Sequence, residues 1–202
     1  MGTKGYNRAD AGDNLSYVFD AFVNKEISGR PCVFLSHKRE DKAACRIIAE
    51  YFKEAEIDYY LDEDDRNLQY ASQAGDPLKI TECIKNGIKK STHMMVVISE
   101  KTYKSQWVPF EVGYGHASIL DQEDLNSKSN NLKLSVLTLK DISDSALPDY
   151  LQVGHIIRGT NSLNEYIQQI TEILEKSLLN EGRIIPSYNQ NHPLDGVLNW
   201  KK

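Results

Sequence analysis

The segment that most restricts the possible folds is the apolar run Met94-Met-Val-Val-Ile98. A strand with one face in water alternates apolar and polar residues, whereas a strand that is covered on both faces is apolar throughout. This run shows no alternation. It therefore predicts a strand inside a sheet that has helices on each side.

The sequence before this run predicts a βαβ unit. Residues 31–36 and residues 58–62 are short runs of strand-forming residues. Between them, apolar residues recur at helical spacing from Ala44 to Ala55. A strand, a helix and a strand in this length indicate two parallel strands.

The alternation continues along the chain. Residues 63–75 are polar and predict a loop, and Asp76 followed by Pro77 predicts a helix start, since Asp caps helices and proline is tolerated at the first position. The helix that follows should turn Ile80, Ile84 and Ile88 to the core, and a further helix is expected from Trp107 to about Leu120. Strands are expected at residues 132–139 and 153–157. A last helix should start at the capping box of Ser162 and Glu165, and its inward-facing residues are Leu163, Tyr166, Ile167, Ile170, Ile173 and Leu174.

Five strands alternating with helices predict an α/β fold with a doubly wound, five-stranded parallel sheet. We assign this domain to residues 31–180. Residues 1–30 are expected to be an extension with a disordered start and one short helix, marked by the helical spacing of Leu15, Val18, Phe19 and Phe22. Residues 181–202 show little periodicity and are expected to be a C-terminal tail that lies on the surface or is partly loose.

Ligands of doubly wound sheets bind outside the carboxyl ends of the strands. The segments 36–41, 63–75 and 105–111 all follow predicted strands and should converge there. In the last of them, Trp107 precedes Glu111 by four residues.

On a helix, Trp107 and Glu111 would share one face, with Phe110 beside them, and Pro109 supports a helix start. Two aromatic rings and one carboxylate could hold an aromatic, cationic ligand. The alternative is that Trp107 and Phe110 belong to the core and that Glu111 only complements the helix dipole.

Composition excludes several classes of function. The net charge of −5 argues against a basic surface that would bind nucleic acid. The chain has no apolar run long enough to span a bilayer and no signal-peptide pattern at its start, so we expect no membrane partner. Cys32, Cys45 and Cys83 fit neither a disulfide framework nor a zinc site, and they predict reduced core residues of a cytoplasmic protein.

The acidic run Asp62-Glu-Asp-Asp65 suggests a metal site, but its spacing does not support one. An EF-hand loop starting at Asp62 would need glycine at position 67 and glutamate at position 73, where the chain has Asn67 and Gln73. A receiver-like magnesium pocket would lack a clear phosphate-accepting partner. We therefore expect no metal site.

Five short motifs in order make the chain resemble the TIR domain from about residue 31 to residue 178. They are Val33-Phe-Leu-Ser-His37, Tyr60-Leu-Asp62, Ile84-Lys-Asn-Gly-Ile88-Lys-Lys-Ser91, Val96-Val-Ile-Ser99 and Trp107-Val-Pro-Phe-Glu111. The resemblance implies a flavodoxin-like fold. It also implies one of two functions, because some TIR domains only assemble with other TIR domains and others cleave the bond between nicotinamide and ribose in NAD.

In the enzymes of this family, a glutamate at the start of the helix after the third strand is catalytic, often four residues after a tryptophan. Glu111 matches that position, and Phe110 matches an aromatic residue found in some bacterial members. A chain of one domain is most similar to bacterial anti-phage TIR proteins such as those of Thoeris systems. That similarity implies a cyclic or otherwise modified ADP-ribose signal and a separate effector protein that senses it.

One carboxylate is enough for this chemistry, because nicotinamide leaves as a neutral molecule and needs no acid. An ionised Glu111 would stabilise the developing oxocarbenium ion and hold the ribose hydroxyls. NAD would be a substrate and not a bound cofactor, since the chain has no glycine-rich phosphate fingerprint.

The expected substrate-binding residues lie in or next to the segments 36–41, 63–75 and 105–111, which we call the rim segments. Phe34 and Ser36 should line the pocket floor, Leu68 should enter the pocket from the loop, and Trp107 and Phe110 should form an aromatic wall. One of His37, Lys38 and Arg39 should reach a phosphate or ribose, with a solvated turn or a TIR–TIR contact as alternatives.

Two hypotheses follow, and both include a homo-oligomer built through TIR–TIR contacts. In the first, the protein is a NAD-consuming enzyme with Glu111 as its catalytic residue. In the second, it is a non-enzymatic TIR scaffold that retains Glu111 for structure. The sequence leaves open the product, which could be ADP-ribose, a cyclic isomer or an adduct.

Overall fold

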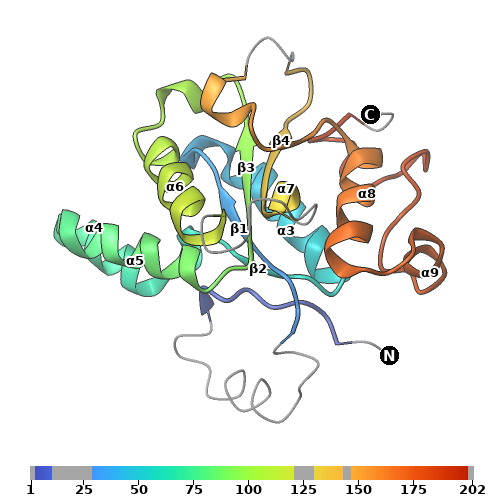
Figure 1. Cartoon of the computed structure of the whole chain (residues 1–202), viewed down its shortest axis with the longest axis horizontal. Coiled ribbons are helices and arrows are strands. Elements are labelled where there is room, and N and C mark those ends of the chain that lie inside the picture. The colour runs from blue at the N-terminus through green and yellow to red at the C-terminus, as the bar shows by residue number, and fades with distance from the viewer. Residues whose placement is uncertain (1–2, 11–28, 121–129, 143–146, 200–202) are drawn as a thin grey trace.

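In the computed structural model, which describes residues 3–10, 29–120, 130–142 and 147–199, a five-stranded sheet lies at the centre (Figure 1). All pairings are parallel, and the strand order is β2-β1-β3-β4-β5. The strands are β1 (Cys32–Ser36), β2 (Asp58–Tyr60), β3 (His93–Ile98), β4 (Leu134–Thr138) and β5 (His155–Ile157). The prediction of a doubly wound, flavodoxin-like α/β fold is confirmed.

Strand β3 is the central strand, and it is covered on both faces as its unbroken apolar run predicted. It pairs with β1 on one side and with β4 on the other. Met95 and Val97 enter the apolar core on one face of the sheet, and Met94 and Val96 enter the core on the opposite face. Successive residues of a strand point to opposite faces, so a strand between two cores must be apolar at every position.

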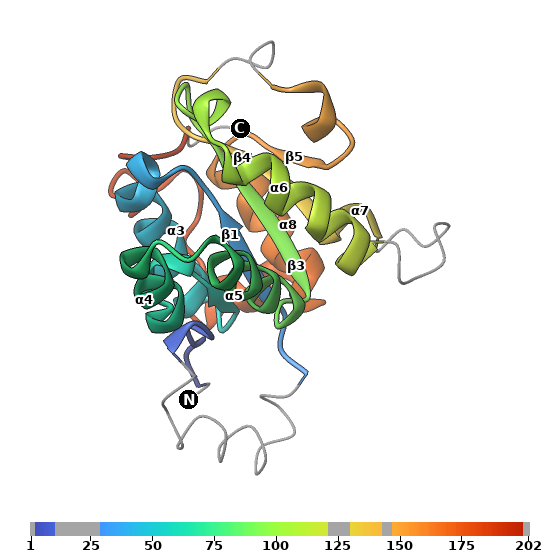
Figure 2. The same ribbon diagram turned by 90° about the vertical axis from the view of Figure 1, so that its left-hand side faces the viewer.

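Helices cover both faces of this sheet (Figures 1 and 2). One core contains residues of α3 and α8, and the other contains residues of α5 and α6. The helices are α3 (Lys42–Glu54), α4 (Arg66–Ala74), α5 (Pro77–Lys89), α6 (Trp107–Gly115), α7 (Asn130–Lys133), α8 (Thr160–Thr171) and α9 (Glu175–Asn180), and a π-helical turn (His116–Leu120) follows α6. Within the described ranges, no helix is long and apolar enough to cross a bilayer.

The prediction of a loop at residues 63–75 is wrong, because this segment contains α4. Asp65 caps the helix by accepting hydrogen bonds from the backbone N–H groups of Asn67 and Leu68, and Gly75 ends it with a positive φ of 63°. Only Ala71 of α4 is buried. A helix that buries so few residues shows no periodic pattern of apolar residues in the sequence. The cap residues Asp65 and Gly75 were the signals that could have predicted it.

The first described residues are ordered against the sheet, which contradicts the expected disorder for residues 3–10. Asn7 forms a parallel bridge with Tyr59 of β2, and the Arg8 guanidinium lies 2.9 Å from the buried carboxylate of Asp58. This segment covers the edge of the sheet beyond β2. The short helix expected around Leu15–Phe22 falls outside the described residues.

The C-terminal tail is packed more firmly than we expected. Ile184, Leu194 and Leu198 are buried in the core beside α3 and α8. The backbone N–H groups of Lys140 and Thr160 donate to carbonyls at positions 197 and 199, both over 2.8 Å. Three separated apolar anchors carry no periodicity, so the sequence pattern could not show this attachment.

Three details of the prediction also change. Helix α8 begins at Thr160, so Ser162 lies inside its first turn, where its hydroxyl accepts from the backbone N–H groups of Arg158 and Gly159. Leu174 is 70% exposed because α8 has ended by then. Cys83 is only partly buried, whereas Cys32 and Cys45 are core residues as predicted.

Changing Gly87 to alanine is expected to lower the free energy of unfolding by about 1–3 kcal/mol. A Cβ at this position of α5 would lie 2.5 Å from the Tyr60 ring, which is itself buried and stacked on Phe34. The matched control is Gly113→Ala on α6, where a Cβ meets open space and should stabilise by about 0.4–1 kcal/mol. Urea denaturation of both variants checks this, and equal midpoints would contradict the packing of α5 on β2.

Candidate functional site

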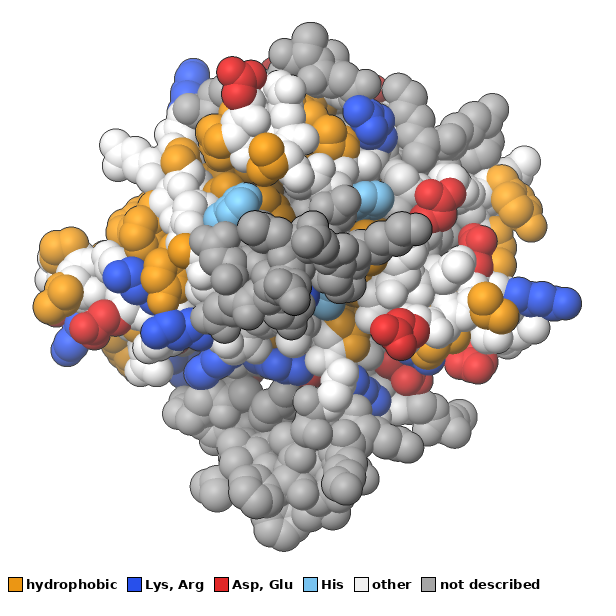
Figure 3. All heavy atoms as spheres, viewed as in Figure 1, with side chains coloured by type: hydrophobic (Ala, Val, Ile, Leu, Met, Phe, Trp, Pro, Cys, Tyr) orange, Lys and Arg blue, Asp and Glu red, His pale blue; other side chains and the backbone are white. Residues whose placement is uncertain are grey.

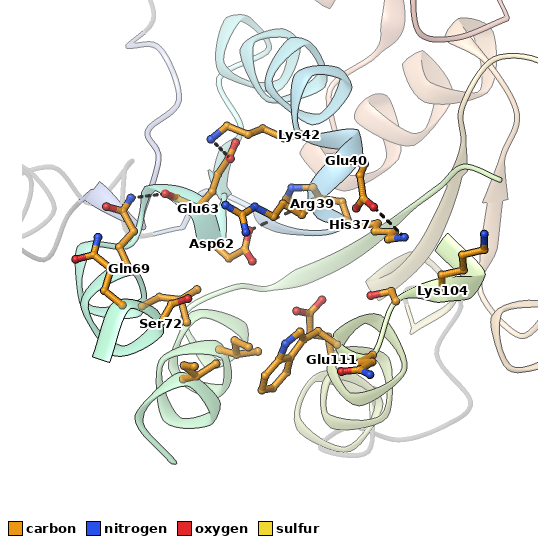
Figure 4. A pocket seen from close by; sticks show the side chains of 18 residues that line it. His37, Arg39, Glu40, Lys42, Asp62, Glu63, Gln69, Ser72, Lys104 and Glu111 are labelled. Atoms are coloured by element: carbon orange, nitrogen blue, oxygen red, sulfur yellow. Dashed lines mark hydrogen bonds and ion pairs between the residues drawn. The ribbon is translucent and has the colours of Figure 1, made fainter. Parts of the chain in front are cut away.

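A cavity of about 660 Å³ lies beyond the carboxyl ends of β1, β2 and β3 (Figure 4). The chain winds outward in opposite directions from the adjacent strands β1 and β3, which makes this the switch point of the sheet. The three predicted rim segments meet here. Of the predicted site residues, those that line the cavity are His37, Lys38, Arg39, Leu68, Trp107 and Glu111.

Glu111 lies in the wall that α6 contributes, and Figure 4 shows its carboxyl group pointing into the cavity. Only 3% of the residue is exposed. The Ser36 hydroxyl donates a hydrogen bond to Glu111 Oε2 over 2.5 Å. The end of β1 and the second turn of α6 therefore fix one carboxyl group together.

The environment of Glu111 favours its neutral form. Burial raises the pKa of its carboxyl to about 8, the nearby negative charge of Asp62 adds to the rise, and the Ser36 hydroxyl opposes it. We expected an ionised carboxylate from the sequence. Burial therefore favours the protonated carboxyl in the free protein, and a ligand that brings positive charge would favour the ionised form.

Trp107 is the first residue of α6 and stays 40% exposed at the cavity. It is therefore not a core residue. Phe110 does not line the cavity. Its ring meets the indole edge-on, with centroids 5.9 Å apart, and stacks on Tyr114 behind it. The rings of Phe110 and Tyr114 therefore support the indole of Trp107 from outside the cavity.

Phe34 and Ser36 lie on the same face of β1 but differ in depth. Phe34 is fully buried and stacks on Tyr60, with ring centroids 5.5 Å apart, so it is not part of the cavity lining. Ser36 ends the strand, is 1% exposed and meets the cavity only through its hydrogen bond to Glu111. Both support the site from behind, which corrects the expectation that they line its floor.

The three residues after β1 differ in their partners. His37 Nδ1 lies 3.0 Å from the Leu35 carbonyl, so it carries the proton that this contact needs. The Lys38 ammonium lies 3.1 Å from a Glu40 carboxylate oxygen. Arg39 is exposed and forms no ion pair with a described residue, so its guanidinium is available at the cavity mouth (Figure 4).

Two rim segments are tied to each other by buried hydrogen bonds. Ser99, directly after β3, donates from its hydroxyl to Asp41 Oδ2 over 2.6 Å, and its backbone N–H donates to the Thr102 hydroxyl. Asp41 lies just before α3. The bond from Ser99 to Asp41 connects the segment that carries His37 and Arg39 to the one that leads into α6 and Glu111, and the bond to Thr102 fixes the turn after β3.

Two parts of the lining were assigned no binding role from the sequence. Asp62 was named as a candidate metal ligand and as part of a TIR motif, and its carboxyl faces the cavity (Figure 4). The α4 residues Gln69, Ser72 and Gln73 also line it. Their spacing of three and four is the signature of one helix face, which would have been visible had α4 been recognised. Among the described residues, no group of three or more His, Cys, Asp or Glu side chains is placed to hold a metal ion.

The fold and the site define a flavodoxin-like α/β protein with a carboxyl-bearing cavity at the switch point of its sheet. A family model described as TIR domain matches residues 33–154, from β1 to the residue before β5. The chain therefore belongs to the TIR domain family. A search of curated proteins found no significant match.

Proposed function

We propose that this TIR protein consumes NAD by cleaving the bond between nicotinamide and ribose. The observation that carries the proposal is the placement of Glu111, which is buried, aimed into a cavity and next to an exposed indole (Figure 4). A cavity of about 660 Å³ is within the range that holds small-molecule ligands.

The cavity contains the groups that this reaction needs. Trp107 offers a flat apolar surface for an aromatic ring. The carboxylate of Glu111 would stabilise the positive charge that develops on the ribosyl unit, inside a wall where it is shielded from water. Nicotinamide leaves without protonation, so no second acid is required. The positive ring of bound NAD would itself favour the ionised form of Glu111.

Arg39 and Lys104 would neutralise the diphosphate of NAD. Both line the cavity, and neither pairs with a carboxylate in the described part of the chain. Guanidinium and ammonium groups bind phosphate oxygens by charge-assisted hydrogen bonds. The diphosphate would then lie across the cavity mouth, and the nicotinamide riboside end would reach inward to Glu111.

The finer activity in this proposal is the production of a cyclic or related ADP-ribose signal in anti-phage immunity, with a separate effector protein as its sensor. Cyclisation requires that water is kept from the ribosyl cation. The deep position of Glu111 supports that requirement. The proposed biological role rests on the resemblance of the sequence motifs to Thoeris-type TIR proteins, since the family match shows the TIR domain alone.

Assembly through TIR–TIR contacts belongs to the same proposal, and a non-enzymatic scaffold is the second candidate. Tyr70 on α4 and Leu78 on α5 are each 69% exposed. Apolar side chains gather over the edge of the molecule formed by these two helices (Figure 3). An exposed apolar surface supports the proposal of a protein contact here, and such a contact would serve a scaffold as well as an enzyme.

The test is incubation of the purified protein with NAD, followed by chromatography and mass spectrometry of the products. ADP-ribose minus one water would identify a cyclase, and ADP-ribose would identify a hydrolase. The reaction is repeated at protein concentrations where light scattering detects assemblies. If assembled protein leaves NAD intact, the enzyme proposal fails and the scaffold is favoured.

Changing Arg39 to glutamine is expected to raise the KM for NAD about 5–30-fold with little change in kcat. The guanidinium would contribute a charge-assisted hydrogen bond to the diphosphate, which is far from the bond that breaks. Steady-state rates at several NAD concentrations check this. The control is Lys89→Gln, which removes one positive charge at the end of α5 outside the cavity. An unchanged KM would show that Arg39 does not touch the substrate.

A further inference from the structure

Asp62 is a second carboxyl group on the wall of the cavity. It follows β2 and faces the space between β1 and α6, across from Glu111 (Figure 4). Its Oδ1 atom is buried and has no hydrogen-bond partner among the described residues. The side chain as a whole is 28% exposed, so it belongs to the cavity wall and not to the core. A buried polar oxygen without a partner is costly and calls for an explanation.

Three basic groups near Asp62 are engaged elsewhere, whereas Arg39 lines the same cavity and forms no ion pair with a described residue. Lys42 and Arg46 both pair with Glu63, and Arg46 also lies 2.6 Å from Asp64. His37 Nδ1 lies 3.9 Å from Asp62 Oδ1, too far for a hydrogen bond, and its proton is directed to the Leu35 carbonyl. Among the described residues, Asp62 forms no close ion pair, unlike Glu63 and Asp64, and the hydrogen bond that its carboxylate accepts comes from the Glu63 backbone N–H and leaves Oδ1 without a donor.

The two cavity carboxyls act on each other. Burial raises the pKa of Asp62, the nearby His37 ring and the Glu63 backbone N–H oppose that rise, and Glu63 and Asp64 add to it. The negative charge of Asp62 in turn raises the pKa of Glu111. The other charged groups that line the cavity are Lys38, Arg39, Glu40, Lys42, Glu63 and Lys104.

We propose that Asp62 is a substrate-binding residue that accepts hydrogen bonds from ribose hydroxyls, and that with Glu111 it makes the cavity selective for a positively charged ribosylated ring over a neutral one. This inference rests on the proposed function and names the ligand chemistry of the same site. A ribose hydroxyl would supply the donor that Asp62 Oδ1 lacks. A cationic ring between the two carboxyls would favour the ionised form of both, which a neutral ring cannot do.

The first experiment needs no catalysis. The Glu111 carboxyl is titrated by carbon-13 NMR in the wild-type protein, in Asp62→Asn and in Asp141→Asn. Asp141 is exposed at a positive φ of 67°, which asparagine tolerates, so this control removes one negative charge outside the cavity. We expect Asp62→Asn to lower the Glu111 pKa by about one unit or more, and Asp141→Asn to leave it unchanged. An unchanged pKa in Asp62→Asn overturns the pairing.

The second experiment measures ligand selectivity. Equilibrium binding compares NADH, whose ring is neutral, with a carbocyclic analogue of oxidised NAD, which keeps the cationic ring and the ribose hydroxyls but cannot be cleaved. We expect the wild-type protein to prefer the cationic analogue about tenfold or more and Asp62→Asn to lose most of that preference. Asp62→Glu keeps the charge and should keep the preference, although its longer side chain misplaces the hydrogen-bond acceptor.

The results separate this inference from the proposed function. If the protein cleaves NAD and Asp62→Asn keeps the wild-type binding preference, the role of Asp62 is wrong and the proposed function stands. If the protein cleaves no NAD but Asp62→Asn loses its preference for the cationic analogue, the binding role stands and the proposed function fails.

Discussion

Replacing Glu111 by glutamine is expected to reduce the rate of NAD cleavage by about 10³-fold, with the fold intact. Stabilisation of transition-state charge by a preorganised group accounts for losses of about 10²–10³-fold when one such group is removed. Among the described residues that line the α6 side of the cavity, Glu111 alone would supply a full negative charge. Glutamine keeps the shape and can still accept the hydrogen bond from Ser36, so the loss reports charge and not packing.

The measurement is the initial rate of nicotinamide release, with circular dichroism to confirm the fold. The matched control is Glu82→Gln, which removes an exposed glutamate from α5 outside the cavity lining and should keep the wild-type rate. If Glu111→Gln retains more than about a tenth of the activity, Glu111 is not the catalytic residue. Cleavage would then have to depend on another group of the cavity.

The same substitution is expected to stabilise the protein at high pH. The pKa of Glu111 is about 8 in the folded state against an ordinary value of 4.5. The folded state therefore holds its proton more tightly than the unfolded state. The stability that this proton provides is fully present below pH 4.5 and is lost as the pH rises through about 8. Glu111→Gln cannot titrate and does not share this loss.

The difference between the two proteins should be small near pH 4.5 and should grow by roughly 1.4 kcal/mol per pH unit above it, to a total on the order of 3–5 kcal/mol above pH 8. Urea denaturation at a series of pH values measures it. Two stability curves that stay parallel from pH 5 to pH 9 would show that burial does not shift Glu111. A catalytic group that weakens the fold while it serves the reaction is the usual trade-off between activity and stability.

The opposite expectations for activity and stability make Glu111→Gln informative about function. The gain in stability at high pH follows from the buried carboxyl in either case, because glutamine keeps the hydrogen bond from Ser36. A carboxyl that serves chemistry would give a stable and inactive protein. The rate of NAD cleavage therefore distinguishes the enzyme from the scaffold, and the stability measurement shows that a loss of activity is not caused by unfolding.

Much of the fold was readable from local patterns. The unbroken apolar run of β3 predicted a sheet with two covered faces, and Asp76 with Pro77 marked the start of α5, where the Asp76 side chain accepts from the Lys79 backbone N–H. Ligands of parallel sheets bind at the carboxyl ends of the strands, and this principle correctly predicted that Glu111, Trp107 and the residues after β1 line one cavity. These predictions depend on the period of the side chains and on cap residues, which the chain carries locally.

Other features could not be read in this way. Helix α4 buries only Ala71, and the C-terminal tail enters the core at apolar residues that are irregularly spaced, so neither leaves a periodic pattern. Phe34 and Ser36 share a face of β1, and the sequence does not show that the first lies deep beneath Tyr60 while only the second reaches Glu111. Depth along a strand depends on which helices cover it, and distant parts of the chain supply those helices.

The sequence by itself determined the order and type of the main elements, the family resemblance and the residue, Glu111, on which the proposed chemistry centres. Only the tertiary structure decided the ionisation of that residue and its pairing with Asp62. A pKa depends on burial and on charges that approach through space. Asp62 and Glu111 belong to separate segments, so no local pattern could have shown that two carboxyl groups face the same cavity.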